Sequence, residues 1–311
     1  MLSEKNFAFD EYDSPADGER VLFVVNPYAG KGISVAKAER LINILRSTGW
    51  KITLYLTKAR HDATCYVSEH GGRFDKIICL GGDGTLNEVI TGLIASGHNI
   101  PIGYIPAGSA NDLGSSIGMP KNNFKAAKKI LSGEIHTHDV GLFNGVNFVY
   151  IASFGAFTEV SWATPQSVKK VFGHSAYVFN GAKALFNIHP YSVRVTTDNE
   201  EFEGRYIYCG ASNTFRVGGM YRFSETEANL SDGLMEIMLV KEPAPAEVGT
   251  LLNKLLRHDF DSKYINFIHS RTAVVEPLDG NYPIWTLDGE KKICNVISNL
   301  SCMHKRVIIV Y

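Results

Sequence analysis

The sequence predicts a fold in two parts: an N-terminal three-layer α/β domain, followed by a C-terminal domain that is mostly antiparallel β and sandwich-like. Three observations support this. A chain of 311 residues exceeds the size at which one hydrophobic core keeps growing, so two domains are expected. From residue 20 to about 140, short apolar runs alternate with amphipathic segments, as in βα units. Beyond about 140, apolar and polar residues alternate with a period of two, which is typical of antiparallel strands.

The N-terminal half is expected to contain four strands and two helices. We expect buried strands at 21–25, 51–56, 76–80 and 102–105, and a helix at 35–48 that Gly49 ends. The clearest helix is expected to open at Thr85, because Thr85 and Glu88 have the spacing of a capping box. Apolar residues then recur at helical spacing until Gly97.

The C-terminal half is expected to form strands at 191–197, 203–212, 234–241 and 273–276. Two helices interrupt this pattern, at 167–186 and, after a Pro-Ala-Pro breaker, at 247–256. The last apolar run, 307–311, is a strand that could return to either domain. Residues 1–19 are read as a polar extension.

The amino-acid composition limits the classes of partner and the cellular location that we expect for the protein. Lys+Arg 31 against Asp+Glu 32 leaves a net charge of -1, so we expect no nucleic-acid partner. Five cysteines without CxxC spacing indicate reduced thiols in a cytoplasmic protein. The N-terminus lacks the features of a signal peptide, and no apolar run approaches the ~20 residues of a spanning helix. Contact with a membrane would therefore be confined to its surface.

Three loops each follow a predicted strand, which in a parallel sheet places them at the edge where ligands bind. We therefore expect them to converge. In the first, residues 26–32, glycines would let backbone approach a phosphate and Lys31 would add a point charge, although a plain turn could look the same. It is not a Walker A loop. The third, residues 106–114, offers Ser109, Asn111 and Asp112, which are also common in ordinary turns.

The second loop, Gly-Gly-Asp-Gly-Thr-Leu-Asn-Glu at 81–88, is the strongest signal. Its glycines permit close ligand approach, and the following helix N-terminus offers free N–H groups and a partial positive charge. Asp83 then stands where a Mg²⁺–phosphate would lie. The alternative is that Asp83 only caps the helix, which is disfavoured if Thr85 fills the cap.

Together these loops resemble the diacylglycerol kinase catalytic domain of soluble bacterial lipid kinases. The wider superfamily also contains sphingosine kinases, NAD kinases and phosphofructokinases, and shares the GGDGT motif. The narrower assignment rests on Asn-Pro-x-x-Gly-Lys at 26–31, GGDGTLNE at 81–88, Gly-x-x-Asn-Asp at 108–112, His-Asp-Val-Gly at 138–141, Leu-Ser-Asp-Gly-Leu-Met-Glu at 230–236 and Asp-Gly-Glu at 288–290. The resemblance runs from about residue 20 to the end.

The resemblance implies an ATP-dependent lipid kinase that converts, most simply, diacylglycerol to phosphatidic acid. Residues 20–140, with 300–311 as a candidate addition, would bind ATP, and 141–299 would bind the lipid. The implied nucleotide-binding residues are Asn26, Pro27, Tyr28, Ala29, Gly30, Lys31, Thr57, Gly82, Asp83, Gly84, Thr85, Leu86, Asn87, Glu88, Ser109, Asn111 and Asp112. Asp83 would organise Mg²⁺ with support from Asp112, Lys31 would lie near the phosphates, and Glu290 would be the base facing the lipid hydroxyl.

The resemblance also implies a structural Mg²⁺ at Asn229, Asp232 and the carbonyl of Leu234, although Asp232-Gly233 could simply be a hairpin turn. The chain departs from the family where Gly218-Gly219-Met220 lacks a third glycine and where Asn229 is neutral. His136 and His138 are two residues apart but have no evident third ligand, so we interpret them as strand-edge residues.

Several alternatives remain open from the sequence. The substrate could be phosphatidylglycerol, a long-chain base or NAD, and the protein could instead be a nucleotide-binding regulator without turnover. Four lysines, Lys121, Lys125, Lys128 and Lys129, could make transient contact with the inner face of an anionic membrane, or form a solvated helix face. The helix at 167–186 could line a lipid slot or belong to the core. A homodimer is a further possibility.

Overall fold

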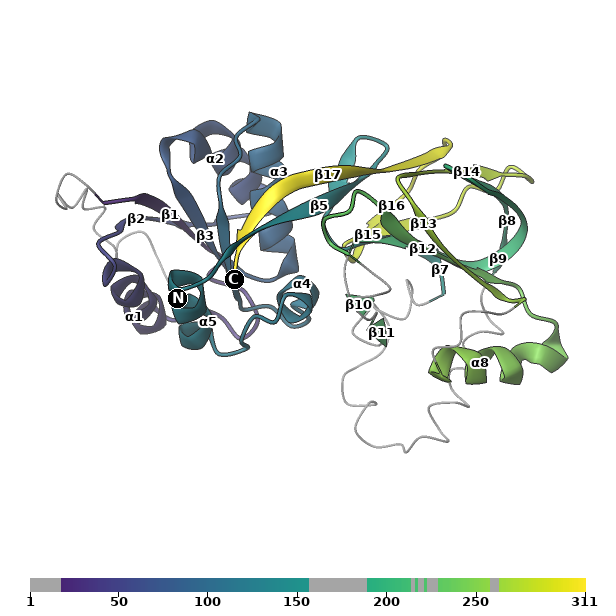
Figure 1. The fold of residues 1–311 in the computed structure, drawn as a ribbon, viewed down its shortest axis with the longest axis horizontal. Helices are drawn as coiled ribbons and strands as arrows, with labels where there is room; N and C mark the ends of the chain where they lie inside the picture. Colours follow the sequence, from purple (N-terminus) through teal and green to yellow (C-terminus); the bar gives the residue numbers. More distant parts are fainter. Residues whose placement is uncertain (1–17, 157–188, 214–215, 218–220, 223–228, 258–262) are drawn as a thin grey trace. The chain divides into compact units, whose positions relative to one another are not determined.

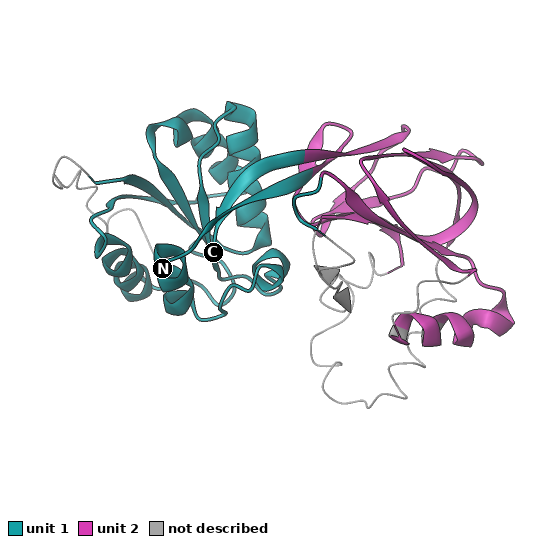
Figure 2. Ribbon diagram, viewed as in Figure 1, with its two compact units in different colours: residues 1–140, 214–232, 304–311 teal, residues 141–213, 233–303 magenta. Residues whose placement is uncertain are grey.

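The chain divides into two compact units, which Figure 2 shows in different colours. The computed structural model describes residues 18–156, 189–213, 216–217, 221–222, 229–257 and 263–311. The first unit comprises residues 1–140, 214–232 and 304–311, and the second comprises 141–213 and 233–303. The extension up to residue 17, the helix expected at 167–186 and the glycine triplet at 218–220 lie outside the described residues.

The first unit is built on a parallel sheet, as predicted. Its strands are β1 (Arg20–Val25), β2 (Lys51–Leu56), β3 (Lys76–Gly81), β4 (Ile102–Pro106) and the end of β17 (Ser298–Val310), in the order β17-β4-β3-β1-β2. The last apolar run of the sequence therefore pairs with β4 in this unit. The runs β1, β3 and β4 are almost fully buried because helices cover both faces of the sheet.

Helices form the outer layers of the first unit (Figure 1). They are α1 (Val35–Arg46) and α5 (Asn123–Leu131) on one face, and α2 (Asp62–His70), α3 (Asp83–Ser96) and the 3₁₀ turn η2 (Gly71–Arg73) on the other, with a short α4 (Asp112–Ser116). Helix α1 ends at Arg46, two residues before the predicted end, because the hydroxyls of Ser47 and Thr48 donate to the last carbonyls. Helix α2 was not predicted, since it buries only Ala63 and Val67.

The predicted capping box at Thr85 and Glu88 is wrong. Helix α3 begins at Asp83 with Gly82 as its N-cap, so Thr85 lies inside the first turn. The Thr85 hydroxyl accepts a hydrogen bond from the Asn26 amide at 3.0 Å. The carboxylate of Glu88 accepts from the backbone N–H groups of His61 and Ala63, where it satisfies the free N–H groups of helix α2 instead of those of its own helix.

The second unit is rich in antiparallel strands, as predicted. Its strands are β6 (Val146–Phe148), β7 (Ile151–Gly155), β8 (Tyr191–Thr197), β9 (Glu201–Ser212), β12 (Met235–Lys241), β13 (Ile265–Ser270), β14 (Thr272–Pro277), β15 (Trp285–Leu287) and β16 (Glu290–Lys292), with the ends of β5 (Ile135–Phe143) and β17. Strand β9 is central, because it pairs with β7, β8 and β12. Strands β10 (Arg216–Val217) and β11 (Tyr221–Arg222) form a separate pair in the first unit.

Two apolar clusters hold the second unit together. The larger is formed by the inward residues of the strands around the fully buried Trp285, which packs against Phe143 and Phe154. The smaller includes Leu251 of α8 (Val248–Arg257), a helix preceded by the 3₁₀ turn η4 (Pro245–Glu247). Among the described residues, no helix has the length and apolar content needed to span a bilayer.

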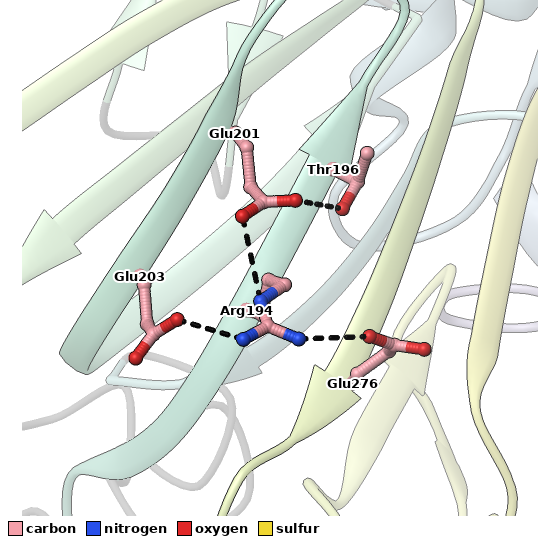
Figure 3. Close-up of polar contacts among 5 residues, drawn as sticks. All are labelled: Arg194, Thr196, Glu201, Glu203 and Glu276. Carbon is pink, nitrogen blue, oxygen red and sulfur yellow. Dashed lines mark hydrogen bonds and ion pairs between the residues drawn. The ribbon is translucent and has the colours of Figure 1, made fainter.

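A cluster of charges marks the outer face of strands β8, β9 and β14 (Figure 3). Arg194 lies between Glu203 at 2.9 Å, Glu201 at 3.5 Å and Glu276 at 3.7 Å. Hydrogen bonding to Glu203 and the negative charges raise the pKa of Arg194. Since Glu203 and Glu276 are its register partners on the two neighbouring strands, the cluster helps to fix strand register.

Candidate functional site

The three glycine loops converge in the first unit, as the sequence predicts, around a cleft of about 460 Å³. The cleft lies at the carboxyl edge of the parallel sheet. It is lined by Asn26, Tyr28, Ala29, Gly30, Thr57, Lys58, Ala59, Arg60, Gly82, Gly84, Thr85, Glu88 and Gly108. Every loop that follows strands β1 to β4 contributes at least one of these residues. The site is therefore the edge of the sheet at which α/β folds bind ligands.

Glycines allow the loops to come this close. A Cβ atom on Gly108 would lie 2.6 Å from the Cα of Gly82, and one on Gly30 would lie 2.3 Å from the carbonyl oxygen of Ala107. The loops after β3 and β4 thus meet backbone to backbone, and the loop after β1 closes against the loop after β4. Gly30 also has a φ of +60°, which larger residues rarely adopt.

The first loop is fixed by Asn26. Its backbone N–H donates to the carbonyl of Leu80 at 3.0 Å, and its side-chain oxygen accepts from the N–H of Tyr28 at 3.0 Å. Its amide nitrogen reaches Thr85 on α3. These bonds join the ends of β1 and β3 and leave the Tyr28 ring 65% exposed at the cleft.

The loop after β2 brings two cations that were not predicted as site residues, Lys58 and Arg60. The Asp62 carboxylate accepts from the backbone N–H of Lys58 at 2.7 Å and from the Tyr55 hydroxyl at 2.8 Å. The Glu88 carboxylate holds the end of the same loop through His61 and Ala63. Lys58 and Arg60 could have been found in the sequence, because they follow a predicted strand just after Thr57.

Two carboxylates, Asp83 and Asp112, start the helices that follow β3 and β4. Burial raises the pKa of the Tyr104 phenol, and the negative charges of Asp83 and Asp112 raise it further. Like Lys31, neither carboxylate is among the residues that line the cleft. Asp112 is itself buried, at 9% exposure, whereas Asp83 is half-buried.

Other predicted site residues have different positions. Lys31 and Ser109 are exposed and do not line the cleft, and Leu86 is buried in the core. The side chain of Asn111 holds the third loop in shape, because its oxygen accepts from the N–H of Gly108 at 2.8 Å and its nitrogen donates to the carbonyl of Gly108 at 2.8 Å. Asn87 accepts from the Thr91 hydroxyl one turn further along α3.

Glu290 belongs to the second unit, where it opens strand β16 and is exposed on a tight hairpin. The turn consists of Asp288 and Gly289, with φ values of 48° and 87°. The Asp288 carboxylate accepts from three consecutive backbone N–H groups, those of residues 149, 150 and 151, at 2.8, 2.8 and 2.9 Å. Asp288 thus anchors the hairpin that presents Glu290, a role that the sequence motif did not reveal.

The segment that contains Asn229 and Asp232 is tied to β5. The Asn229 side chain accepts from the N–H of Ser231 at 3.0 Å, the carbonyl of Leu230 accepts from the N–H of Asp139 at 2.8 Å, and the Ser231 hydroxyl donates to the carbonyl of Thr137. Gly233 has a φ of 82°, as expected for a turn. In the part of the chain that the structure describes, no group of three His, Cys, Asp or Glu side chains could hold a metal ion.

The two histidines of β5, His136 and His138, lie against the ring of Tyr311. The His136 ring stacks on Tyr311 with centroids 4.2 Å apart, and the His138 ring lies 5.6 Å from Tyr311. Burial, with a smaller contribution from the charge of His136, lowers the pKa of His138 to about 4. The side chain of His138 is therefore buried and neutral.

The comparisons with known proteins agree with one another. Residues 20–143 match the profile of the diacylglycerol kinase catalytic domain. A diacylglycerol kinase from Bacillus subtilis is 30% identical over 241 residues, which cover 77% of this chain and 79% of that protein. One from Staphylococcus saprophyticus is 29% identical over 235 residues, covering 75% and 77%. The crystal structure of a diacylglycerol kinase from Bacillus anthracis has a TM-score of 0.72 and 22% identity, covering 94% of this chain and 97% of that one, which supports the fold alone.

Proposed function

The chain belongs to the diacylglycerol kinase family of lipid kinases, as its motifs predicted, and from this premise we propose that it phosphorylates the hydroxyl of diacylglycerol with ATP. One observation carries the proposal. Three glycine loops and the cationic loop after β2 surround one cleft of about 460 Å³ at the carboxyl edge of the sheet. A polyphosphate is the ligand that such backbone N–H groups and cations suit.

In this proposal the cleft holds ATP. The N-terminus of α3, with Gly82 and Gly84 lining the cleft, offers backbone N–H groups to the phosphates. Lys58 and Arg60 line the cleft and add positive charge there, whereas Lys31 lies outside the lining. The exposed ring of Tyr28 offers an apolar face to the adenine base.

The residues near Asp83 fit a Mg²⁺ ion. Carboxylate oxygens are the donors that this ion prefers, and Asp83 and Asp112 begin the helices that follow β3 and β4, at the edge of the sheet where the cleft lies. Asp83 would bind the ion together with the nucleotide, and Asp112 would support it. Bound there, Mg²⁺ would supply charge neutralisation at the phosphates.

Glu290 would act as the general base. Phosphoryl transfer needs positioning and charge stabilisation more than covalent chemistry, so one proton acceptor for the lipid hydroxyl completes the requirements. The proton passes from the hydroxyl to the Glu290 carboxylate as the oxygen bonds to the γ-phosphorus and ADP departs. The bonds to Asp288 hold the backbone of the hairpin from which Glu290 projects.

We further propose that Asn229, Asp232 and the carbonyl of Leu234 hold a structural Mg²⁺. All three groups are oxygen donors in one short segment, and Asp232 is exposed to solvent. The Asn229 oxygen already accepts one hydrogen bond, which leaves it a second lone pair.

The test is a phosphorylation assay with labelled ATP and, in turn, diacylglycerol micelles, phosphatidylglycerol, a long-chain base and NAD. We expect turnover with diacylglycerol, and we expect Glu290→Gln to lower kcat by ~10²–10⁴ while the KM for ATP changes little. Asp83→Ala should abolish Mg²⁺-dependent turnover without loss of melting temperature. The matched control is Glu134→Gln, an exposed glutamate on the first unit that lies outside the cleft.

Phosphorylation of NAD but not of lipid would replace the proposal with an NAD kinase. ATP binding without turnover on any acceptor would make the protein a regulator. If Glu290→Gln kept more than about a tenth of the wild-type kcat, another group would have to accept the proton.

A further inference from the structure

The surface of the second unit carries exposed aliphatic side chains that flank the Glu290 hairpin. They are Val146, Ile284, Ile293, Val296 and Ile297, with exposures of 39, 40, 67, 57 and 41%. We call this set the aliphatic tip. We propose that the aliphatic tip inserts into the surface of an anionic lipid bilayer, an inference that rests on the proposed function.

The segments that carry the aliphatic tip are neighbours in the structure. Trp285 pairs with Lys292 in the hairpin, so Ile284 and Ile293 occupy the next position along the two strands. The Asn144 amide nitrogen donates to the Cys294 sulfur and to the Ile297 carbonyl, both at 3.2 Å. Asn144 belongs to the turn that leads into Val146, and this turn therefore lies against the segment that carries Val296.

The segment 293–297 is also held in place. The Asn144 side-chain oxygen accepts from the N–H of Asn299 at 2.8 Å, and the Asn144 N–H donates to the Asn299 carbonyl at 2.9 Å. Cys294 packs against the larger apolar cluster of the unit. Cys294 thus ties this segment to the core, while Ile293 and Val296 are exposed to solvent. A single exposed aliphatic residue needs no explanation, but five of them on neighbouring segments indicate a contact surface.

The composition of the surface favours a bilayer over a protein partner. Lys291 and Lys292 are exposed and directly precede Ile293. Lysines next to exposed aliphatic side chains suit an anionic membrane. The negative lipid headgroups attract the lysines, and the aliphatic side chains enter the region between headgroups and acyl chains. Protein interfaces are enriched in aromatic residues, Met and Arg and depleted in Lys, whereas the aliphatic tip has no aromatic member and stands beside two lysines; Tyr282, at 37% exposure, is the one exposed aromatic side chain near it in the described sequence.

The lysine face of α5 lacks a comparable apolar anchor. Lys121, Lys125 and Lys128 are exposed, but Lys129 donates to the Gly118 carbonyl at 3.2 Å. In the described residues from 117 to 131, no large hydrophobic side chain is exposed. The aliphatic tip also lies next to Glu290 in the chain, and a base for a lipid hydroxyl has to work at the bilayer surface.

The experiment measures co-sedimentation of the full chain with phosphatidylglycerol vesicles and with phosphatidylcholine vesicles, without ATP or diacylglycerol. We expect binding to phosphatidylglycerol and much weaker binding to phosphatidylcholine. Ile293→Ser/Val296→Ser should weaken vesicle binding at least tenfold, by an order-of-magnitude estimate from lost apolar burial. Lys291→Gln/Lys292→Gln should weaken it by roughly fivefold per lysine at low salt. The matched control is Ile135→Ser, which alters an isoleucine of similar exposure, 65%, in the first unit.

Turnover on a water-soluble short-chain diacylglycerol separates this inference from the proposed function. The Ile293→Ser/Val296→Ser variant should keep that turnover and its melting temperature while losing turnover on vesicles. If the wild type binds vesicles through the tip but never phosphorylates soluble diacylglycerol, the proposed function fails and the docking surface stands. Vesicle binding equal to that of the wild type in both double variants would overturn the proposal. So would a wild-type dimer that the Ile293→Ser/Val296→Ser variant converts to monomer, because a second copy would then cover the tip.

Discussion

The contact between Gly82 and Gly108 allows a sharp test of how the cleft is built. A Cβ atom added at Gly108 would lie 2.6 Å from the Cα of Gly82 and 2.9 Å from the Asn111 side-chain oxygen. The φ of Gly108 is not in the left-handed region, so alanine is compatible with its backbone and only the contact opposes it. Backbone atoms cannot rotate away as a side chain can. The loops after β3 and β4 must therefore separate.

We expect Gly108→Ala to lower the free energy of unfolding by about 1–3 kcal/mol, the usual cost of overpacking. The separation of the loops should also disturb the Asn111 hydrogen bonds and raise the KM for ATP. Gly84→Ala is the matched comparison, because a Cβ there meets no atom within 4 Å. In the first turn of α3 that substitution should raise stability by roughly 0.5 kcal/mol, since alanine favours helix over glycine.

Chemical denaturation and ATP titration of both variants decide the matter. Since Gly84 lines the cleft, Gly84→Ala should weaken ATP binding without destabilising the fold. If Gly108→Ala were as stable as the wild type, or if both variants lost the same stability, close packing of the loops would not explain these glycines.

Three further perturbations test other parts of the structure. Asp288→Asn keeps the positive φ but sets an amide nitrogen against one of three backbone N–H donors, so unfolding free energy should fall by roughly 2–4 kcal/mol, and kcat should fall with it. His138 has its folded pKa near 4, below the unfolded value of about 6.5, so the unfolded chain binds more protons between these pH values. Stability should therefore decrease as the pH falls through this window, by about 3 kcal/mol at most, and His138→Phe should flatten the slope. Asp232→Ala should remove the rise in melting temperature that Mg²⁺ produces, because a ligand bound to the native state stabilises it.

Each of these predictions has an outcome that contradicts it. Unfolding free energy unchanged in Asp288→Asn would show that the hairpin is held by other contacts. An equal pH slope for His138→Phe, measured by denaturation between pH 4 and 7, would assign the acid sensitivity to other groups. A Mg²⁺-induced shift that persists in Asp232→Ala would make the 229–234 segment an ordinary turn.

The strands of the first unit were predictable because local burial dictates them. Strand β2 has the predicted limits, and β1, β3 and β4 differ from theirs by a single residue. Strands that are covered on both faces read as continuous apolar runs, a signal that needs no knowledge of partners. The convergence of the glycine loops was predictable as well, because parallel strands place their carboxyl ends on one edge of the sheet.

Side-chain partners distant in sequence were not predictable. Glu88 has the spacing of a cap for its own helix, yet it binds the start of α2, which lies 25 and 27 residues away in the chain. Asp288 reaches backbone groups about 138 residues earlier. Sequence spacing reports only neighbours along one element, so it could not choose between a local cap and a distant donor.

What the sequence determined by itself is thus the type and order of most elements, the glycine loops and the family, because these depend on local pattern and motif. Tertiary structure alone decided which polar groups those loops offer. It brought Lys58 and Arg60 into the cleft, left Lys31 outside it, and buried His138 against the end of the chain. The physical reason is that a side chain's chemistry depends on burial and on hydrogen-bond partners, and both are set only when distant segments pack together.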